Sequence, residues 1–144
     1  MSQPIIPGII PSPTWTTDGV HHVAITVLDL VQAEHFYGVV LGLQVQRRWF
    51  ESDGKTPRSI WFALGQDSFL AVERVGRDIN GVTDSTKSGW HLLALRIQCD
   101  AREAWRERLH RLGFPCTEDT AYTLYCRDPE GNRVGLSHWP TPAP

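Results

Sequence analysis

Two segments of the chain, 70 residues apart, carry the same residue pattern. The first is GVHHVAITV (19–27) and the second is GWHLLALRI (89–97); they align Gly with Gly, His21 with His91, and apolar residues at most other places. An internal duplication is the simplest account of this match. The 144 residues therefore predict two similar halves within one compact unit.

Each copy is followed by a segment with helical periodicity. Asp29 and Asp100 precede these segments, and each has Gln or Glu three residues later, which is typical of a capping box at a helix start. Apolar residues then recur at helical spacing, and Gly42 or Gly113 stands where a left-handed C-cap is needed. Each half is thus expected to contain one amphipathic helix.

Short runs rich in β-branched and aromatic residues follow each helix, separated by turn-forming residues. They cover 44–50, 58–64 and 68–75 in the first half and 114–119, 121–127 and 132–138 in the second. The predicted fold class is α+β, with two βαβββ modules forming a curved mixed sheet around a concave cavity. The expected boundaries are an extended N-terminal arm at 1–17, modules at 18–75 and 90–140, and a linker at 76–89.

Charge and composition exclude several classes of partner. The net charge of −2 provides no basic field for nucleic acid or an anionic membrane, and no apolar run is long enough to cross a membrane. The first residues lack the basic region of a secretory signal. Three cysteines are an odd number without CxxC spacing, which favours reduced thiols and a cytoplasmic location.

Alternation along the first strand predicts which side chains reach the cavity. Successive strand residues point to opposite faces, so only one of the adjacent histidines His21 and His22 can face it. Val23, Ile25 and Val27 share the parity of His21 and form the more apolar set, which we expect to pack under the helix. His22, with the small residues Ala24 and Thr26, is therefore predicted to face the cavity.

The segments HHVAITVLDL, HFYGVVLGL and DPEGNRVGL give the chain a resemblance to the vicinal oxygen chelate superfamily over residues 18–140. This superfamily includes glyoxalase I, extradiol dioxygenases, fosfomycin-modifying enzymes, methylmalonyl-CoA epimerase and bleomycin-resistance proteins. The resemblance implies two βαβββ modules, a small-molecule ligand and a homodimer, against which the N-terminal arm with Trp15 is expected to lie. It leaves the reaction open, because one scaffold carries many chemistries.

The resemblance also implies a divalent metal held from four equivalent strand positions. Carried over to this chain, these positions fall on His22, on Leu92, on Gly135, and on Ala71 or Glu73. Leucine and glycine side chains cannot coordinate a metal, so we expect a degenerate site with no metal cofactor. The alternative is a one-residue bulge that turns His91 inward and restores a set of His22, His91 and Glu73 for a divalent-metal-dependent lyase, isomerase or extradiol-type dioxygenase.

The remaining polar and aromatic residues of the cavity predict how a ligand would bind. Arg96 suits a carboxylate, phosphate or enolate, although a simple ion pair with Glu73 is the alternative. His22 is the candidate acid or base, oriented by Glu73, with Arg96 stabilising an oxyanion; a hydrogen-bonded histidine without chemistry is the alternative. Trp61 could wall the cavity for a flat ligand. The predicted binding residues for an aromatic or anionic small molecule are His22, Thr26, Trp61, Glu73, Arg96 and Ser137.

Overall fold

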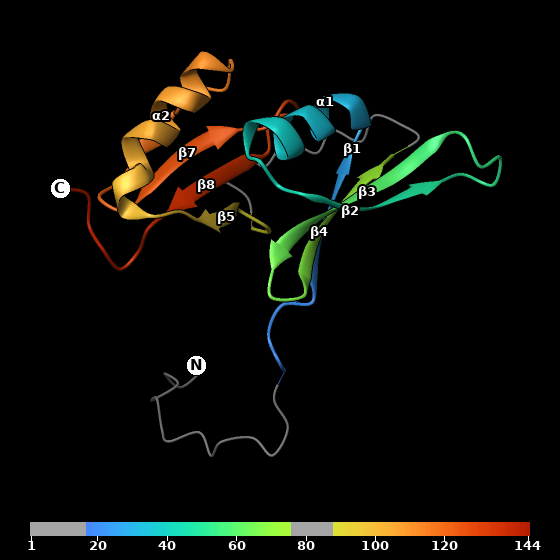
Figure 1. Ribbon diagram of the computed structural model, residues 1–144, viewed down its shortest axis with the longest axis horizontal. Coiled ribbons are helices and arrows are strands. Elements are labelled where there is room, and N and C mark those ends of the chain that lie inside the picture. Colours follow the sequence, from blue (N-terminus) through green and yellow to red (C-terminus); the bar gives the residue numbers. More distant parts are fainter. Residues whose placement is uncertain (1–16, 76–87) are drawn as a thin grey trace, which may run out of the picture.

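The computed structural model describes residues 17–75 and 88–144, which form two four-stranded mixed sheets (Figure 1). Except for Thr17, the expected N-terminal arm lies outside the described residues, as does most of the expected linker. The first sheet has the order β1-β4-β3-β2 and the second has β5-β8-β7-β6. Their strands are β1 (His22–Val27), β2 (Val45–Phe50), β3 (Pro57–Gly65), β4 (Ser68–Arg74), β5 (Leu93–Arg96), β6 (Glu118–Asp119), β7 (Thr123–Arg127) and β8 (Arg133–Ser137).

The two sheets share one topology, as the sequence repeat predicts. In each sheet the first strand of the half pairs in parallel with the last, and the other neighbours are antiparallel. Ala24 lies opposite Ala71 in the first sheet, and Ala94 lies opposite Gly135 in the second. The predicted α+β fold of open, mixed sheets is confirmed.

The helices confirm part of the predicted capping. In the first half, α1 (Leu30–Glu34) continues into the π-helical segment η1 (His35–Val40), and the Asp29 carboxylate accepts a hydrogen bond of 3.0 Å from the Gln32 amide. In the second half the Asp100 cap is wrong, because η2 (Cys99–Ala101) intervenes before α2 (Arg102–Arg111). Gly42 and Gly113 have φ of 76° and 89°, as left-handed helix ends require. No helix in residues 17–75 or 88–144 is long and apolar enough to cross a membrane.

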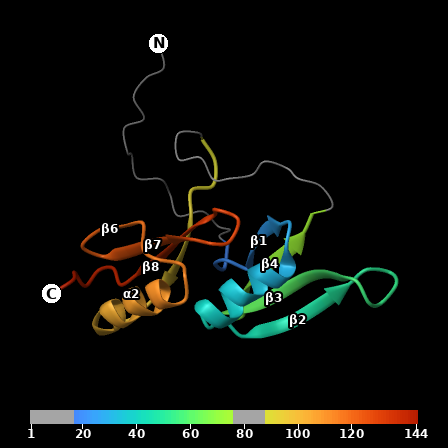
Figure 2. The ribbon, with the colours of Figure 1, turned by 90° about the horizontal axis from the view of Figure 1, so that it is seen from above.

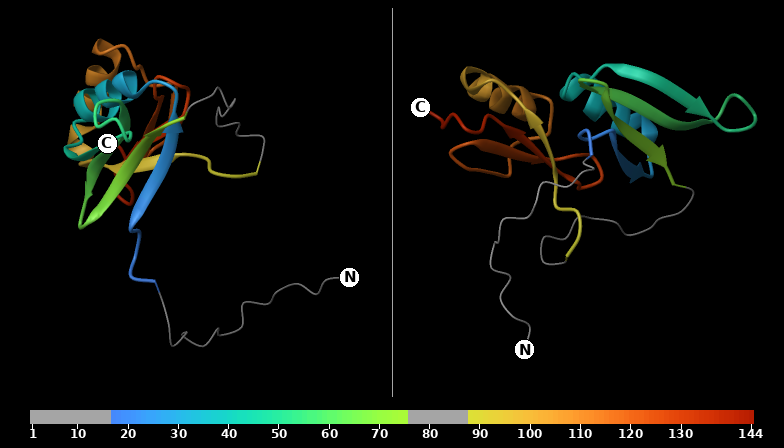
Figure 3. Two further views of the ribbon diagram at one scale, coloured as in Figure 1. Left: turned by 90° about the vertical axis from the view of Figure 1, so that its right-hand side faces the viewer. Right: turned by 90° about the horizontal axis from the view of Figure 1, so that it is seen from below.

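The helices of both halves lie on one side of the molecule, where the core forms (Figures 1 and 3). Seen from above, the halves lie side by side and the β2–β3 hairpin projects away from the second half (Figure 2). The buried apolar side chains come from both halves and include Val27, Phe36, Val40, Phe62, Leu70, Leu109, Leu124 and Leu136.

Polar contacts join the two halves at the helix ends. Both oxygens of the Glu130 carboxylate accept hydrogen bonds of 2.8 Å from the Leu28 amide, and one accepts a bond of 3.2 Å from the next amide. In the opposite direction, the guanidinium of Arg108 on α2 donates to the carbonyls of Val39 and Val40 at 2.7 and 2.9 Å. Each half therefore satisfies backbone groups that a helix end of the other leaves unpaired.

Candidate functional site on the open sheet faces

The face of the first sheet that points away from the helices is here called its open face. Its members alternate with core residues along β1, β3 and β4, as the parity argument for β1 predicts: Val27 is buried in the core, whereas His22, Ala24 and Thr26 are exposed. Strand pairing extends this face across the sheet. It comprises His22, Ala24, Thr26, Phe69, Ala71, Glu73, Ser59, Trp61, Ala63, Arg47 and Trp49.

A row of aromatic rings crosses the open face of the first sheet. The His22 imidazole stacks on Phe69 with 4.9 Å between ring centroids, and Phe69 stacks on Trp61 at 4.3 Å. Trp61 meets Trp49 in a T-shaped contact at 5.3 Å. Because the stacked rings cover each other's faces, a ligand approaching from solvent meets mainly ring edges. Trp61 lies on the predicted face, but its ring does not form an uncovered stacking wall.

His22 and its neighbour His21 form a pair at one end of this row. Their Nδ1 atoms are 2.8 Å apart, so one ring donates a hydrogen bond and the other accepts it. Both imidazoles are exposed. His22 thus occupies the predicted face, with its ring engaged by His21 and Phe69.

Glu73 lies on the same face as His22 but far along the strands. His22 is opposite Phe69, whereas Glu73 is opposite Thr26, four residues farther along β1. At about 3.3 Å per residue this separates the two positions by about 13 Å. Glu73 therefore does not orient the His22 imidazole, and the two side chains do not fit one metal ion. In the part of the chain that the structure describes, no group of three or more His, Cys, Asp or Glu side chains could hold a metal.

On the second sheet, Leu92 packs against Gly135. The resemblance assigns both of these positions to metal ligands, and neither residue has a side chain that can coordinate a metal. A Cβ built on Gly135 would lie 3.5 Å from Leu92 Cδ1, 3.5 Å from Tyr125 Cε1 and 3.1 Å from Thr123 Cγ2. Leu92 therefore covers Gly135, a strand position that the resemblance assigns to a metal ligand. This crowding leaves little space for a longer side chain at residue 135, so the residues of this sheet do not fit a metal centre.

His91 takes part in a contact at the margin of the second sheet. It lies just before β5 and its Nε2 accepts a hydrogen bond from the Arg133 guanidinium, which also pairs with Glu118 and lies 4.0 Å from the Tyr125 ring centroid. The contact with a cation does not suit His91 to ligate a metal. The β5–β8 register is regular from Leu93 to Arg96 and begins two residues after His91.

The predicted residues Arg96 and Ser137 lie opposite each other on β5 and β8. The hydroxyl of Thr123 donates to the Ser137 hydroxyl at 3.0 Å, and the Arg96 side chain is exposed. Within the described ranges, no ion pair joins Arg96 to Glu73. The face of the second sheet that points away from the helices, here called the second open face, is thus polar around Arg96, in contrast to the aromatic open face of the first sheet.

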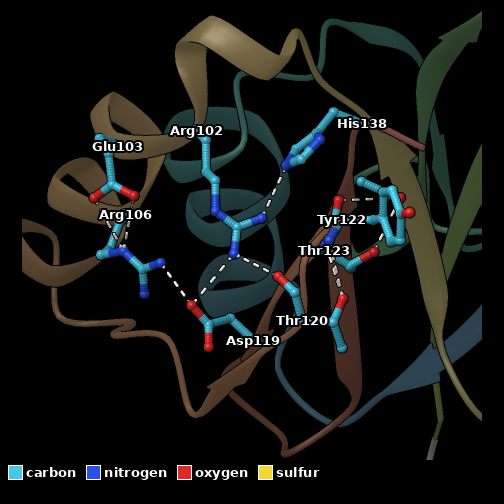
Figure 4. Close-up of polar contacts among 9 residues, drawn as sticks. Arg102, Glu103, Arg106, Asp119, Thr120, Tyr122, Thr123 and His138 are labelled. Carbon is cyan, nitrogen blue, oxygen red and sulfur yellow. Dashed lines mark hydrogen bonds and ion pairs between the residues drawn. The ribbon is translucent and has the colours of Figure 1, made fainter. Parts of the chain in front are cut away.

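The last histidine of the chain belongs to a buried network near α2 (Figure 4). His138, which directly follows β8, is buried, with only 4% of its surface exposed. Its Nε2 accepts a hydrogen bond of 2.8 Å from Arg102, whose guanidinium also donates to the Thr120 carbonyl at 2.7 Å and the Asp119 carboxylate at 3.2 Å. Arg106 lowers the pKa of Asp119 by a hydrogen bond of 2.7 Å. The Thr120 hydroxyl accepts from the Thr123 amide, and the Thr123 hydroxyl donates to Ser137, so the network extends from α2 across to Ser137 on the second sheet.

A hollow of about 490 Å³ lies beside α2, apart from the predicted site residues. Burial raises the pKa of the Cys116 thiol in its wall, which disfavours the reactive thiolate. The hollow therefore carries no evident chemistry. It is lined by Glu103, Arg106, Glu107, His110, Pro115 and Cys116.

Sequence patterns alone did not identify Arg47, Phe69 or Ser59 as members of the first open face. Arg47 lies with its guanidinium 4.9 Å from the Trp49 ring centroid, Phe69 forms the middle of the aromatic row, and Ser59 lies opposite Trp49. Period-2 alternation from Trp61 along β3 would have found Ser59. Phe69 follows in the same way from Ala71 on β4.

Comparisons with known proteins agree with this fold. A family model described as Glyoxalase/Bleomycin resistance protein/Dioxygenase superfamily matches residues 19–136. The comparison with curated proteins finds no match.

Among solved structures, a glyoxalase/dioxygenase from Nostoc punctiforme has a TM-score of 0.66 at 17% identity and covers 94% of this chain and 96% of its own. The fosfomycin resistance protein FosX from Listeria monocytogenes has a TM-score of 0.65 at 15% identity, covering 85% and 92%. Lactoylglutathione lyase from Agrobacterium tumefaciens has a TM-score of 0.61 at 21% identity, covering 85% and 95%. At these identities the structures establish the shared fold alone.

Proposed function

Because the chain belongs to the Glyoxalase/Bleomycin resistance protein/Dioxygenase superfamily, we propose that it binds a small molecule on its open sheet faces without a resident divalent metal. The packing of Leu92 over Gly135 carries this proposal. It fills two of the four strand positions that the resemblance assigns to metal ligands. The separation of Glu73 from His22 along the first sheet gives further support.

The candidate ligand is an aromatic or anionic small molecule. His22, Thr26, Trp61 and Glu73 belong to the open face of the first sheet, and Arg96 and Ser137 to that of the second. Arginine and hydroxyl groups suit an anionic substituent, and the ring edges of the first face suit an aromatic body through edge-to-face contact.

A metal-dependent lyase, isomerase or dioxygenase is the second candidate. One FosX structure in the comparison is described as a complex with Mn(II) and 1S,2S-dihydroxypropylphosphonic acid, so relatives of this fold do hold a metal. In the present chain such a site would rest on His22, Glu73 and His91. The separation of about 13 Å between the first two positions, four residues along the strands, weighs against it.

We further propose that the protein is a cytoplasmic homodimer. The three cysteines are free, which agrees with a reducing compartment. A second copy could bring the aromatic open face of one protomer near the face that carries Arg96 in the other. Sedimentation velocity at micromolar concentration would detect the dimer; a monomer under these conditions would contradict it.

A blocking substitution on the open face tests the proposed function. Thr26→Trp would fill part of the first open face, and Val31→Trp, at an exposed position on α1, is the matched control. A library of small aromatic acids is screened by thermal shift against protein treated with a chelator. Hits should stabilise the wild type and the control and fail to stabilise Thr26→Trp. Stabilisation that appears only after Mn(II) is added would instead support the metal-dependent candidate.

A further inference from the structure

Four side chains at the β2–β3 edge of the first open face form a cluster of hydrogen-bond donors. Trp49 lies opposite Ser59, and Arg47 lies opposite Trp61, so the four occupy neighbouring positions on two paired strands. Indole and guanidinium groups can only donate hydrogen bonds, and the serine hydroxyl can do so. The cluster of Arg47, Trp49, Ser59 and Trp61 is here called the donor cluster.

Three polar atoms of the donor cluster have no partner. Trp49 Nε1, Trp61 Nε1 and Ser59 Oγ are buried and form no hydrogen bond within the described part of the protein. Ser59 as a whole is only 3% exposed. Leaving a buried polar group without a hydrogen-bond partner is energetically unfavourable, and most such groups in folded proteins are satisfied. Three of them at adjacent positions therefore indicate a missing acceptor.

The charges around the donor cluster favour an anionic acceptor at its outer side. The Arg47 guanidinium lies 4.9 Å from the Trp49 ring centroid, at the edge of the sheet. Glu73, the nearest acidic member of this face in the strand register, lies opposite Ser59 on the side away from β2. An anion would thus be attracted at the Arg47 side and repelled at the Glu73 side, which places it toward β2.

The edge position of β2 provides a route to these buried atoms. Its pairing with β3 shifts register between Val45 and Arg47 and again between Trp49 and Phe50. Trp49 therefore lies on a short regular stretch of an edge strand, where its side chain can turn outward with little loss of sheet pairing.

We propose that the donor cluster is a carboxylate subsite of the small-molecule face. One carboxylate oxygen accepts from Ser59 and Trp61, and the other accepts from Arg47 and, after its side chain turns, from Trp49. This inference rests on the proposed function and adds to it the chemical class of the ligand's polar group. The ligand is then an organic acid whose carboxylate binds on the open face over the paired strands β2 and β3.

Indole NMR signals test the subsite directly, with benzoate as the probe and neutral benzamide as its isostere. The six tryptophans give separate side-chain signals, and Trp49→Phe and Trp61→Phe assign the two that matter. Benzoate should shift these two signals and leave the other four unchanged. It should bind at least fivefold more tightly than benzamide, since a charged hydrogen bond is about twice as strong as a neutral one.

Two variants separate binding from folding. Ser59→Ala removes an unpartnered buried hydroxyl, so its melting temperature should equal or exceed that of the wild type while benzoate affinity falls at least fivefold. Arg47→Met should abolish the preference for benzoate over benzamide, and Arg58→Met, another exposed arginine on the adjoining strand, should retain it. A Ser59→Ala protein that is less stable and binds benzoate unchanged would overturn the subsite.

The outcomes also distinguish this inference from the proposed function. If library hits depend on Thr26 but benzoate leaves both indole signals in place, the open face binds ligands and the carboxylate subsite is wrong. If benzoate moves the indole signals and no hit depends on Thr26, the subsite exists and the wider face is not the binding site. If benzoate shifts none of the indole signals, the carboxylate subsite is wrong. Water is then the hydrogen-bond partner of the two indole groups and the Ser59 hydroxyl.

Discussion

The phenol of Tyr37 in the first half donates a hydrogen bond of 2.9 Å to the carboxylate of Asp128 in the second half. Both side chains are buried. Asp128 also accepts from the amides of Glu130 and Asn132, which shape the DPEGN turn. The turn that carries part of the family resemblance thus serves here to hold the two halves together.

Tyr37→Phe should lower the free energy of unfolding by about 1–2 kcal/mol. The substitution removes one buried hydrogen bond to a carboxylate and keeps the aromatic ring in the core. Urea denaturation followed by circular dichroism would measure the change. Tyr122→Phe is the control, since no hydrogen bond from its hydroxyl is found among residues 17–75 and 88–144. An equal decrease in the free energy of unfolding in both variants would show that the hydrogen bond from Tyr37 to Asp128 does not stabilise the fold.

Stability should fall as the pH rises above 9. Burial raises the pKa of the Cys126 thiol to about 12, from an ordinary value of 9.0. Burial and the Asp128 carboxylate also raise the pKa of Tyr37 above its ordinary value of 10.0. The folded protein therefore keeps protons that the unfolded chain releases. The contribution of each protonated group to the free energy of unfolding is complete below its ordinary pKa and decreases as the pH rises above that pKa.

Urea titrations between about pH 8 and about pH 11, with a reductant present, would measure this decline. Tyr37→Phe should show a shallower decline above pH 10 than the wild type, because it lacks the phenol that titrates. A stability that is constant across this range would contradict the protonated state of both groups in the fold.

Glu130→Gln should destabilise the protein by about 1 kcal/mol, in the range of a lost helix cap. The Glu130 carboxylate accepts bonds from the Leu28 and Asp29 amides just before α1, and the amide side chain of Gln keeps only one acceptor oxygen and no charge. Glu107→Gln, at an exposed position on α2, provides the control and should be neutral. Urea midpoints would compare the two variants, and equal midpoints would argue against the contact between the halves.

Gly135→Ala should cost about 1–2 kcal/mol, because the added methyl group would meet a crowded site. Its nearest neighbour, Thr123 Cγ2 at 3.1 Å, cannot easily move, since the Thr123 amide and hydroxyl are bonded to Thr120 and Ser137. Thr123→Ser removes that methyl group and keeps the hydroxyl. Gly135→Ala should therefore cost less in the Thr123→Ser background, and a double-mutant cycle of unfolding free energies with no coupling would rule out this clash.

Arg102→Met should be the most destabilising of these changes, at about 3 kcal/mol. It leaves His138 and the Thr120 carbonyl without their buried donor. Arg106→Met is a matched control, since Arg106 also pairs with Asp119 but is far more exposed, and it should have a much smaller effect. Urea unfolding curves of the two variants would give their free energies of unfolding. A larger decrease for Arg106→Met than for Arg102→Met would show that the buried hydrogen bonds of Arg102 are not the source of stability.

Local patterns were sufficient for most of the fold. The strands at 19–27 and 89–97 are visible in the residue pattern of each short segment. The Asp29 cap and the glycines after both helices likewise depend on residues close together in the chain. Strand parity is also local, and it placed His22 and Glu73 correctly on one face. The Asp100 cap failed because a single 3₁₀ turn delays the helix, which the capping pattern alone does not reveal.

The sequence by itself determined the two modules, the faces of their strands, and the loss of ligating side chains at Leu92 and Gly135. Only the tertiary structure decided the distances. Strand register set His22 about 13 Å from Glu73, and packing between strands left Trp49, Trp61 and Ser59 without partners. The physical reason is that alternation follows from backbone geometry within a strand, whereas register and side-chain packing depend on the whole sheet.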